Sequence, residues 1–136
     1  MTGLLVVDAS VAVKWFKPHG EQHLEQALEL LVAHRDGDVT LAAPAHLRLE
    51  VLNALWSKRV DARRLGQVAR ALDDFELAWF EIDRDLTEDA ARIAAEARLT
   101  VYDAAYAALA RRLDAELLTC DAVLLAAGAC RVRSLG

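Results

Sequence analysis

The sequence alternates short, continuous apolar runs with longer segments of helical periodicity. Residues 4–7 read Leu-Leu-Val-Val and are followed at once by Asp8, and the apolar run near residues 116–119 is followed by Asp121. A continuous apolar run is typical of a strand that is buried on both faces, as strands of parallel sheets are. Strands that alternate with helices predict an α/β fold with a mainly parallel sheet.

The expected elements follow from the same patterns. Strands are predicted over residues 4–7, 39–42, 77–82, 116–119 and 130–133, the last at a sheet edge. Helices are predicted from Asp8 to a stop near residues 18–20, and over residues 24–35, 44–58, 61–72, 86–97, 101–112 and 121–127. Pro44 is expected at the first helical position and Asp61 as a helix cap.

Length and charge limit the classes of protein that remain. With 136 residues, we expect one domain over residues 1–136. No apolar run reaches the roughly 18 residues that span a bilayer, and Asp8 interrupts the start of the chain, so we expect no signal peptide and a cytoplasmic protein. The net charge of −5 argues against a general nucleic-acid coat protein, which presents a basic surface.

The cysteines and histidines do not predict a zinc site. Cys120 and Cys130 form no CxxC pair, so we expect free thiols. His19 and His23 are four residues apart, but no nearby cysteine or third histidine completes a ligand set.

Two acidic residues stand where two predicted strands end. Asp8 directly follows residues 4–7, and Asp121 lies two residues past Thr119. Ligands of parallel α/β sheets bind beyond the carboxyl ends of the strands, which favours a functional role for both aspartates. The alternative is that each is only the N-cap of the following helix.

Two further acids stand in apolar helical surroundings. Glu50 shares one helical stripe with His46, Asn53 and Ser57, which indicates a polar seam facing a cleft or, alternatively, a solvated face. Asp103 is the only charged residue between positions 101 and 110. A helix that is apolar nearly all round is buried, so this carboxylate needs a partner, unless it forms a capping box with Thr100.

Taken together, the four acids predict a divalent cation site. Carboxylates that converge raise one another's pKa and destabilise the fold unless a cation neutralises them. An all-oxygen donor set favours Mg²⁺ or Mn²⁺ over zinc. Such an ion suits phosphate chemistry, because it polarises a phosphoryl oxygen and activates water.

The chain resembles the PIN-domain ribonucleases, specifically the VapC-type toxins of bacterial toxin–antitoxin pairs. The resemblance covers essentially the whole chain. Four segments carry it: Val6-Val7-Asp8-Ala9-Ser10, Pro44 with Glu50-Val51 and Asn53-Ala54-Leu55, Tyr102-Asp103-Ala104-Ala105-Tyr106, and Leu118-Thr119 with Asp121 and Leu124. No single segment is specific, but their order and spacing in a chain this short are.

The resemblance implies a Rossmann-like parallel sheet of strand order 3-2-1-4-5 with about seven flanking helices. It implies an Mg²⁺- or Mn²⁺-dependent endoribonuclease that a cognate VapB-type antitoxin inhibits, a homodimer, and a higher toxin–antitoxin complex. Contact with membranes, or with DNA by this chain itself, is not expected. By match to the family motifs, the catalytic and metal-binding acids are Asp8, Glu50, Asp103 and Asp121, and the supporting polar residues are Ser10, Asn53 and Thr119.

Contacts to RNA phosphates are expected from Lys14 and Lys17, which are nearly one turn apart on the helix after Asp8. The alternative is ordinary solvated surface charge. Since no aromatic residues are interleaved with basic ones, the sequence predicts no base-stacking platform.

Other readings of the acids remain. Haloacid-dehalogenase-like phosphatases need a second aspartate where this chain has Ser10, and receiver domains need paired early acids and a late lysine, whereas the last lysine here is Lys58. The remaining alternative is a catalytically silent binding module whose acidic pocket binds a basic partner peptide.

Overall fold

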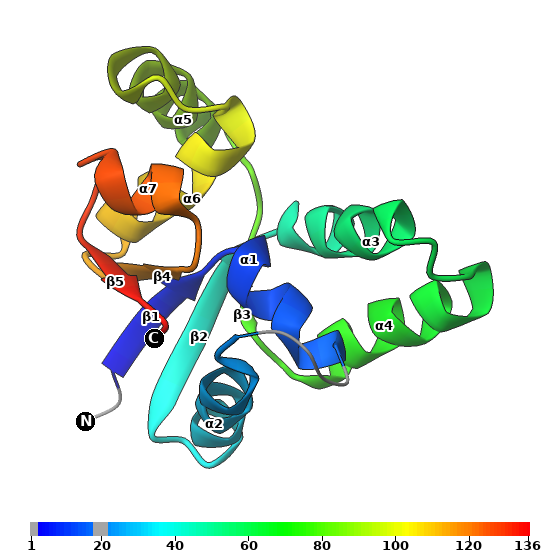
Figure 1. The fold of residues 1–136 in the computed structure, drawn as a ribbon. Coiled ribbons are helices and arrows are strands. Elements are labelled where there is room, and N and C mark those ends of the chain that lie inside the picture. Colours follow the sequence, from blue (N-terminus) through cyan, green and yellow to red (C-terminus); the bar gives the residue numbers. More distant parts are fainter. Residues whose placement is uncertain (1–2, 18–21) are drawn as a thin grey trace.

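A five-stranded sheet organises the computed structural model, which describes residues 3–17 and 22–136 (Figure 1). Its strands are β1 (Gly3–Val7), β2 (Val39–Pro44), β3 (Ala78–Phe80), β4 (Glu116–Thr119) and β5 (Val132–Ser134). They lie in the order β3-β2-β1-β4-β5, and every neighbouring pair is parallel. The expected α/β class and strand order 3-2-1-4-5 are confirmed.

The central strand is the most apolar one. Val6 and Val7 of β1 are fully buried, because β2 and β4 flank β1 and helices cover the sheet. Val7 pairs with Leu118 of β4. The carboxyl ends of β1 and β4 therefore lie side by side, although more than a hundred residues separate them in the sequence.

The helices fill the connections between the strands. They are α1 (Ala9–Ala12), continued by the 3₁₀ helix η1 (Val13–Phe16), and α2 (Leu24–Arg35), α3 (Leu47–Ser57), α4 (Ala62–Asp74), α5 (Arg84–Ala97), α6 (Val101–Arg112) and α7 (Ala122–Ala126). Figure 1 shows α5, α6 and α7 gathered at one side of the molecule and the α3–α4 pair projecting from the other. Among the described residues, no helix has the length and apolar character needed to cross a membrane.

Helix α6 forms the centre of the core. It packs against β1, β2 and β4, and α5 packs on it in turn. All seven residues from position 104 to position 110 are buried, including the large side chain of Tyr106. This burial explains why residues 101–110 carry a single charge, because a charge elsewhere on this helix would be taken from water without a partner.

Several element boundaries differ from the sequence predictions, and the clearest difference is at Pro44. Pro44 does not open a helix: it is the last residue of β2, paired with Phe80, and α3 begins three residues later at Leu47. The ladder to β3 continues through Ala45, whose N–H donates to the Phe80 carbonyl at 2.8 Å. A proline, which lacks an N–H, is tolerated at the end of a strand.

The helix predicted after Asp8 tightens into η1 after one turn, and its predicted stop at residues 18–20 lies outside the described residues. The strand predicted over residues 77–82 is shorter in the structure, where it is β3. The strand predicted over residues 130–133 is β5, which begins two residues later and ends one residue later than predicted. The predicted N-cap of α4 is confirmed, because the Asp61 side chain accepts from the Arg64 N–H at 2.8 Å.

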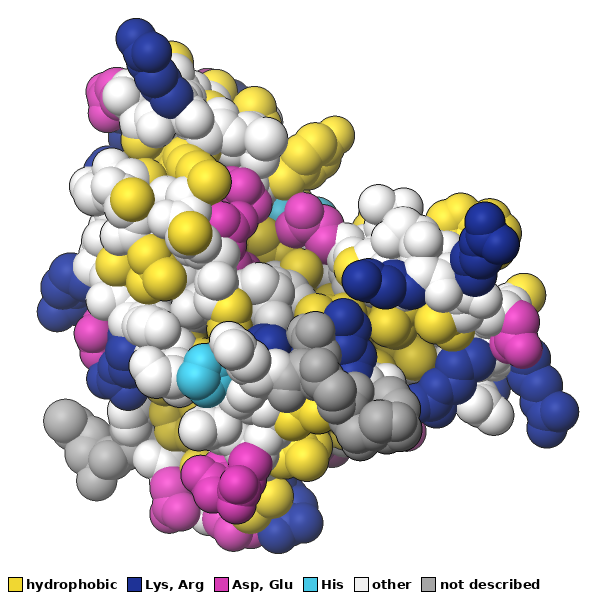
Figure 2. Space-filling view, in the orientation of Figure 1, with side chains coloured by type: hydrophobic (Ala, Val, Ile, Leu, Met, Phe, Trp, Pro, Cys, Tyr) yellow, Lys and Arg dark blue, Asp and Glu magenta, His cyan; other side chains and the backbone are white. Residues whose placement is uncertain are grey.

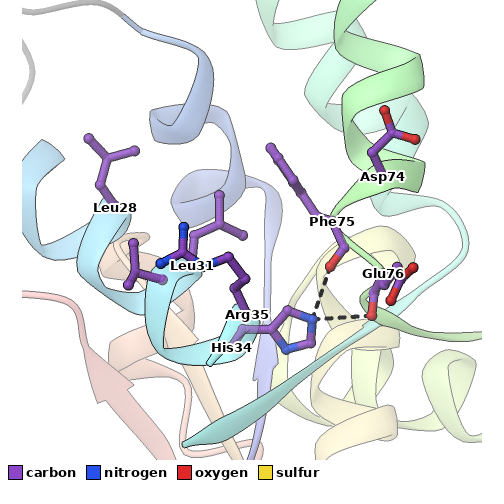
Figure 3. A pocket seen from close by; sticks show the side chains of 8 residues that line it. Leu28, Leu31, His34, Arg35, Asp74, Phe75 and Glu76 are labelled. Atoms are coloured by element: carbon purple, nitrogen blue, oxygen red, sulfur yellow. Dashed lines mark hydrogen bonds between the residues drawn. The ribbon is translucent and has the colours of Figure 1, made fainter. Parts of the chain in front are cut away.

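His34 joins α2 to the connection after α4, beside a cavity of about 650 Å³ lined by both apolar and charged side chains (Figure 3). Its Nε2 lies 3.1 Å from the carbonyl oxygens of Phe75 and Glu76, and its Nδ1 accepts from the Leu41 N–H at 3.0 Å. Since carbonyls only accept and a backbone N–H only donates, the ring is neutral with its proton on Nε2.

We expect His34→Ala to lower the free energy of unfolding by about 1–3 kcal/mol, because it leaves these backbone groups without their partner. Urea denaturation measures the change. Arg35→Ala is the matched control, since Arg35 follows on the same helix with an exposed side chain and should change stability by less than about 0.5 kcal/mol. Equal losses in the two variants would contradict the role assigned to His34.

Candidate active site

The four predicted acids line one cavity of about 250 Å³ at the carboxyl ends of β1 and β4. Asp8 follows β1, Glu50 lies on α3, Asp103 lies on the first turn of α6, and Asp121 caps α7. Figure 2 shows acidic side chains gathered in the hollow between the α3–α4 part and the α5–α7 part of the molecule. Four separate segments of the chain thus supply negative charge to a single place.

Asp8 is buried, with 3% of its surface exposed. Its Oδ2 accepts from Thr119 Oγ1 at 2.5 Å, and its Oδ1 accepts from Ser10 Oγ at 2.6 Å and from the Val11 N–H at 3.3 Å. Burial raises the pKa of Asp8 to about 6 in spite of these hydrogen bonds, and the charge of Asp121 raises it further. The carboxylate is therefore held firmly in one orientation at a cost in stability.

Ser10 and Thr119 extend this arrangement to the second aspartate. Ser10 Oγ accepts from the Cys120 N–H at 2.8 Å, and Thr119 Oγ1 accepts from the Asp121 N–H at 3.0 Å. Asp121 in turn caps α7 by accepting from the Val123 N–H at 2.8 Å. Asp8 and Asp121 are thus helix caps and cavity residues at once, so the two alternatives weighed from the sequence do not exclude each other.

Glu50 is oriented by a tyrosine and a histidine. Tyr106 Oη donates to Glu50 Oε1 at 2.6 Å, and His46 Nε2 lies 3.4 Å from the same oxygen and 3.0 Å from the Tyr102 carbonyl. Burial and the neighbouring Glu50 carboxylate raise the pKa of Tyr106 far above its usual range. Tyr106 is therefore a permanent hydrogen-bond donor to Glu50.

Asp103 has a half-buried side chain. Its backbone N–H donates to Thr100 Oγ1 at 3.1 Å, which is the N-cap half of a capping box. The Thr100 hydroxyl stabilises the charged form of the Asp103 carboxylate. Burial raises the pKa of Asp103, and the charges of Asp121 and Glu50 raise it further. This mutual repulsion marks an excess of negative charge inside the cavity.

The residues present fit a divalent cation. The cavity offers four carboxylates, and no lysine or arginine lines it to neutralise them. In the described part of the chain, no three acidic, histidine or cysteine side chains are close enough to form a ready-made metal cage. Mg²⁺ does not need one, because it keeps several waters and binds through one or two carboxylates.

The other predicted site residues divide into two groups. Ser10 and Thr119 support Asp8, whereas Asn53 faces a neighbouring cavity together with His46 and Tyr102. Lys14 is buried, and its Nζ donates to the Gln22 carbonyl at 2.8 Å; Lys17 is half-buried. Contact of either lysine with RNA phosphate stays a prediction.

The sequence analysis missed the contact of Tyr106 with Glu50. A signal was available, since Tyr106 carries a hydroxyl in residues 104–110, which are otherwise alanine and leucine. Cys120 and Cys130 are in the thiol form, as expected, and both are half-buried.

Comparison with known proteins points to one family. The family model for the PIN domain matches residues 5–129. Ribonuclease VapC3 of Pyrobaculum aerophilum is 34% identical over 122 residues, which cover 86% of this chain and 88% of that protein.

Solved structures share the fold. VapC20 of Mycobacterium tuberculosis, a sarcin-ricin loop cleaving toxin, has a TM-score of 0.75 at 20% identity, covering 95% of this chain and 98% of that one. A toxin–antitoxin complex from Klebsiella pneumoniae has a TM-score of 0.71 at 19% identity, with 97% and 98% covered.

The raised pKa of Asp8 predicts that the metal-free protein loses stability as the pH rises from about 4 to 6. The folded state holds the Asp8 proton more tightly than the unfolded state, whose pKa is 3.8. The stabilisation is therefore complete below pH 3.8 and is lost as the pH passes the folded pKa. The loss attributable to Asp8 is up to about 3 kcal/mol.

Chemical denaturation at several pH values in EDTA measures this effect. Asp8→Asn has no proton to lose, so its unfolding free energy should fall less than that of the wild type over the same interval. Parallel curves for the two proteins would refute the assignment to Asp8.

Proposed function

Because this chain belongs to the PIN-domain family, in the group of the VapC-type toxins, we propose that it is an endoribonuclease that hydrolyses RNA phosphodiester bonds with Mg²⁺ or Mn²⁺. The observation that carries the proposal is the cavity in which Asp8, Glu50, Asp103 and Asp121 meet without a balancing basic side chain. A relative named as a ribonuclease, similar over most of its length, supports the same reaction.

Asp8, Asp103 and Asp121 are the residues that would hold the ion, with Glu50 at the edge of the same cavity. A bound divalent ion supplies Lewis acidity to a phosphoryl oxygen and acidifies water. The protein's own contribution at Asp8 is orientation, because Thr119 and Ser10 each fix one carboxylate oxygen. Asp103 contributes a half-buried carboxylate that lines the same cavity as Asp8 and Asp121.

Glu50 acts on water in this proposal. Tyr106 holds Glu50 Oε1 by a hydrogen bond. Glu50 Oε2 accepts no hydrogen bond from the described residues, so it is able to accept one from a water molecule in the cavity. A carboxylate held in this way orients the attacking water and takes up its proton. Tyr106 serves as a positioning residue, because it acts through Glu50.

The same site offers a means of control by a partner. The structural relatives include toxin–antitoxin complexes, and we extend this to the present chain as the toxin partner of a VapB-type antitoxin. A basic segment of that partner would compete for the four carboxylates. The proposal also comprises a single domain over residues 1–136, a homodimer within a larger toxin–antitoxin complex, and a cytoplasmic location.

We expect Asp103→Asn to lower the rate of RNA cleavage by on the order of 100-fold or more, since it removes charge that the reaction centre needs. Cleavage of a single-stranded RNA by the purified protein with Mn²⁺ or Mg²⁺ measures it, and EDTA should stop the wild type. Asp114→Asn is the matched control, because Asp114 is exposed, lies away from the cavity and has a left-handed backbone that asparagine accepts.

Undiminished cleavage by the folded Asp103→Asn variant would refute the role of this carboxylate. A wild type that binds a basic peptide but cleaves no RNA with either metal would favour the silent binding module instead.

We expect Tyr106→Phe to slow cleavage by roughly 10-fold, because a freed Glu50 carboxylate no longer holds water in one place. The loss should appear in kcat more than in KM. The double variant with Glu50→Gln should be no slower than Glu50→Gln alone, since both changes remove the same arrangement. Additive losses would show that Tyr106 acts independently of Glu50.

A further inference from the structure

A second cavity adjoins the acidic one. Its volume is about 440 Å³, and Glu50 and Ala54 line both cavities. The remaining wall of this second cavity comes from His46, Leu49, Asn53 and Tyr102. The acidic cavity and the second cavity therefore adjoin each other at Glu50. A polymer that is bound in the acidic cavity extends directly into the second cavity.

The wall of the second cavity presents uncovered flat and apolar surface. The Tyr102 side chain is 65% exposed and that of Leu49 is 70% exposed. Tyr102 stands beside the His46 ring, at 6.3 Å between centroids, and His46 packs on Tyr106 at 4.7 Å. The buried rings hold Tyr102 in place from behind, while its outer face is open for a planar group to stack on.

Polar groups without partners complete the wall. The Asn53 side-chain amide makes no hydrogen bond to the described residues, so it offers one acceptor and two donors. His46 Nδ1 is buried and has no hydrogen-bond partner. His46 Nε2 faces two acceptors and therefore carries a proton, and these contacts hold the His46 ring beside Tyr102.

The negative charge of the second cavity favours a neutral group over a phosphate as its occupant. Glu50 contributes negative charge, and no lysine or arginine lines the wall, so a phosphate group is repelled. A neutral planar ring with hydrogen-bond donors and acceptors on its edge meets every group present. Single-stranded RNA offers such a ring, since unstacked bases bind on aromatic side chains and pair with side-chain amides.

We propose that this cavity binds a nucleobase of the RNA strand, next to the phosphate that lies in the acidic cavity. Tyr102 stacks on the base, and the exposed Asn53 amide meets its edge. This subsite rests on the proposed ribonuclease function and gives it a preference for single-stranded RNA with a base at one defined position. It also places a stacking residue where the sequence indicated none.

The test uses a single-stranded RNA oligonucleotide that the wild type cleaves at one mapped position, and versions of it with one abasic ribose at each nearby position. For the wild type, one abasic position should lower kcat/KM by roughly 10-fold, the usual worth of base–aromatic stacking. Tyr102→Ala should show the same loss on intact RNA and no further loss at that abasic position. Tyr102→Phe should behave as the wild type.

Val101→Ala is the matched control, since Val101 precedes Tyr102, is half exposed and does not line the cavity; it should keep the full abasic effect. Normal cleavage of intact RNA by Tyr102→Ala would overturn the proposed subsite. A lowered kcat/KM of Tyr102→Ala that no abasic RNA reproduces with the wild type would overturn it as well. A changed elution volume of Tyr102→Ala with an unchanged abasic effect would show instead a protein interface. A wild type that cleaves no RNA would overturn the proposed function itself.

Discussion

The buried carboxylate of Asp8 is the interaction on which the arrangement depends. Val7 lies opposite Leu118 in the parallel ladder between β1 and β4. The residues that follow them, Asp8 and Thr119, therefore meet at the carboxyl ends of these two neighbouring strands. Their hydrogen bond at 2.5 Å joins the two central strands where both turn into helices. Replacing water around a carboxylate costs free energy that hydrogen bonds only partly recover. The fold accepts that cost at the point where it concentrates negative charge.

The cavity combines requirements that oppose each other. Carboxylates that lie together raise one another's pKa, which weakens the fold when no cation is present. Two of the acids compensate in part, because Asp8 and Asp121 cap the helices that begin after their strands. The acidic charge that first argued against a nucleic-acid partner is thus partly the charge of one site. In the proposed reaction, binding of RNA in that site would depend on the ion rather than on a basic surface.

Patterns of single segments were predictable, and contacts between distant segments were not. Helix α6 and strand β4 have the predicted bounds, because each contains a continuous apolar run that is buried, residues 104–110 in the case of α6. Pro44 was misassigned because its place in β2 depends on Phe80, 36 positions later, rather than on local preference. The four acids were found through their unusual surroundings. The contact of Tyr106 with Glu50 joins residues 56 positions apart, so a hydroxyl in an apolar segment indicated that Tyr106 has a partner but not that the partner is Glu50.

The ends of the sheet limit how another protein chain attaches to this one. Both outermost strands, β3 and β5, have only three residues. An extended peptide that adds to a sheet needs a row of free backbone N–H and carbonyl groups, and strands this short supply very few. Self-assembly into continuous sheets is disfavoured for the same reason. A protein partner would therefore have to bind through side chains on helix faces and in cavities rather than through the strand edges.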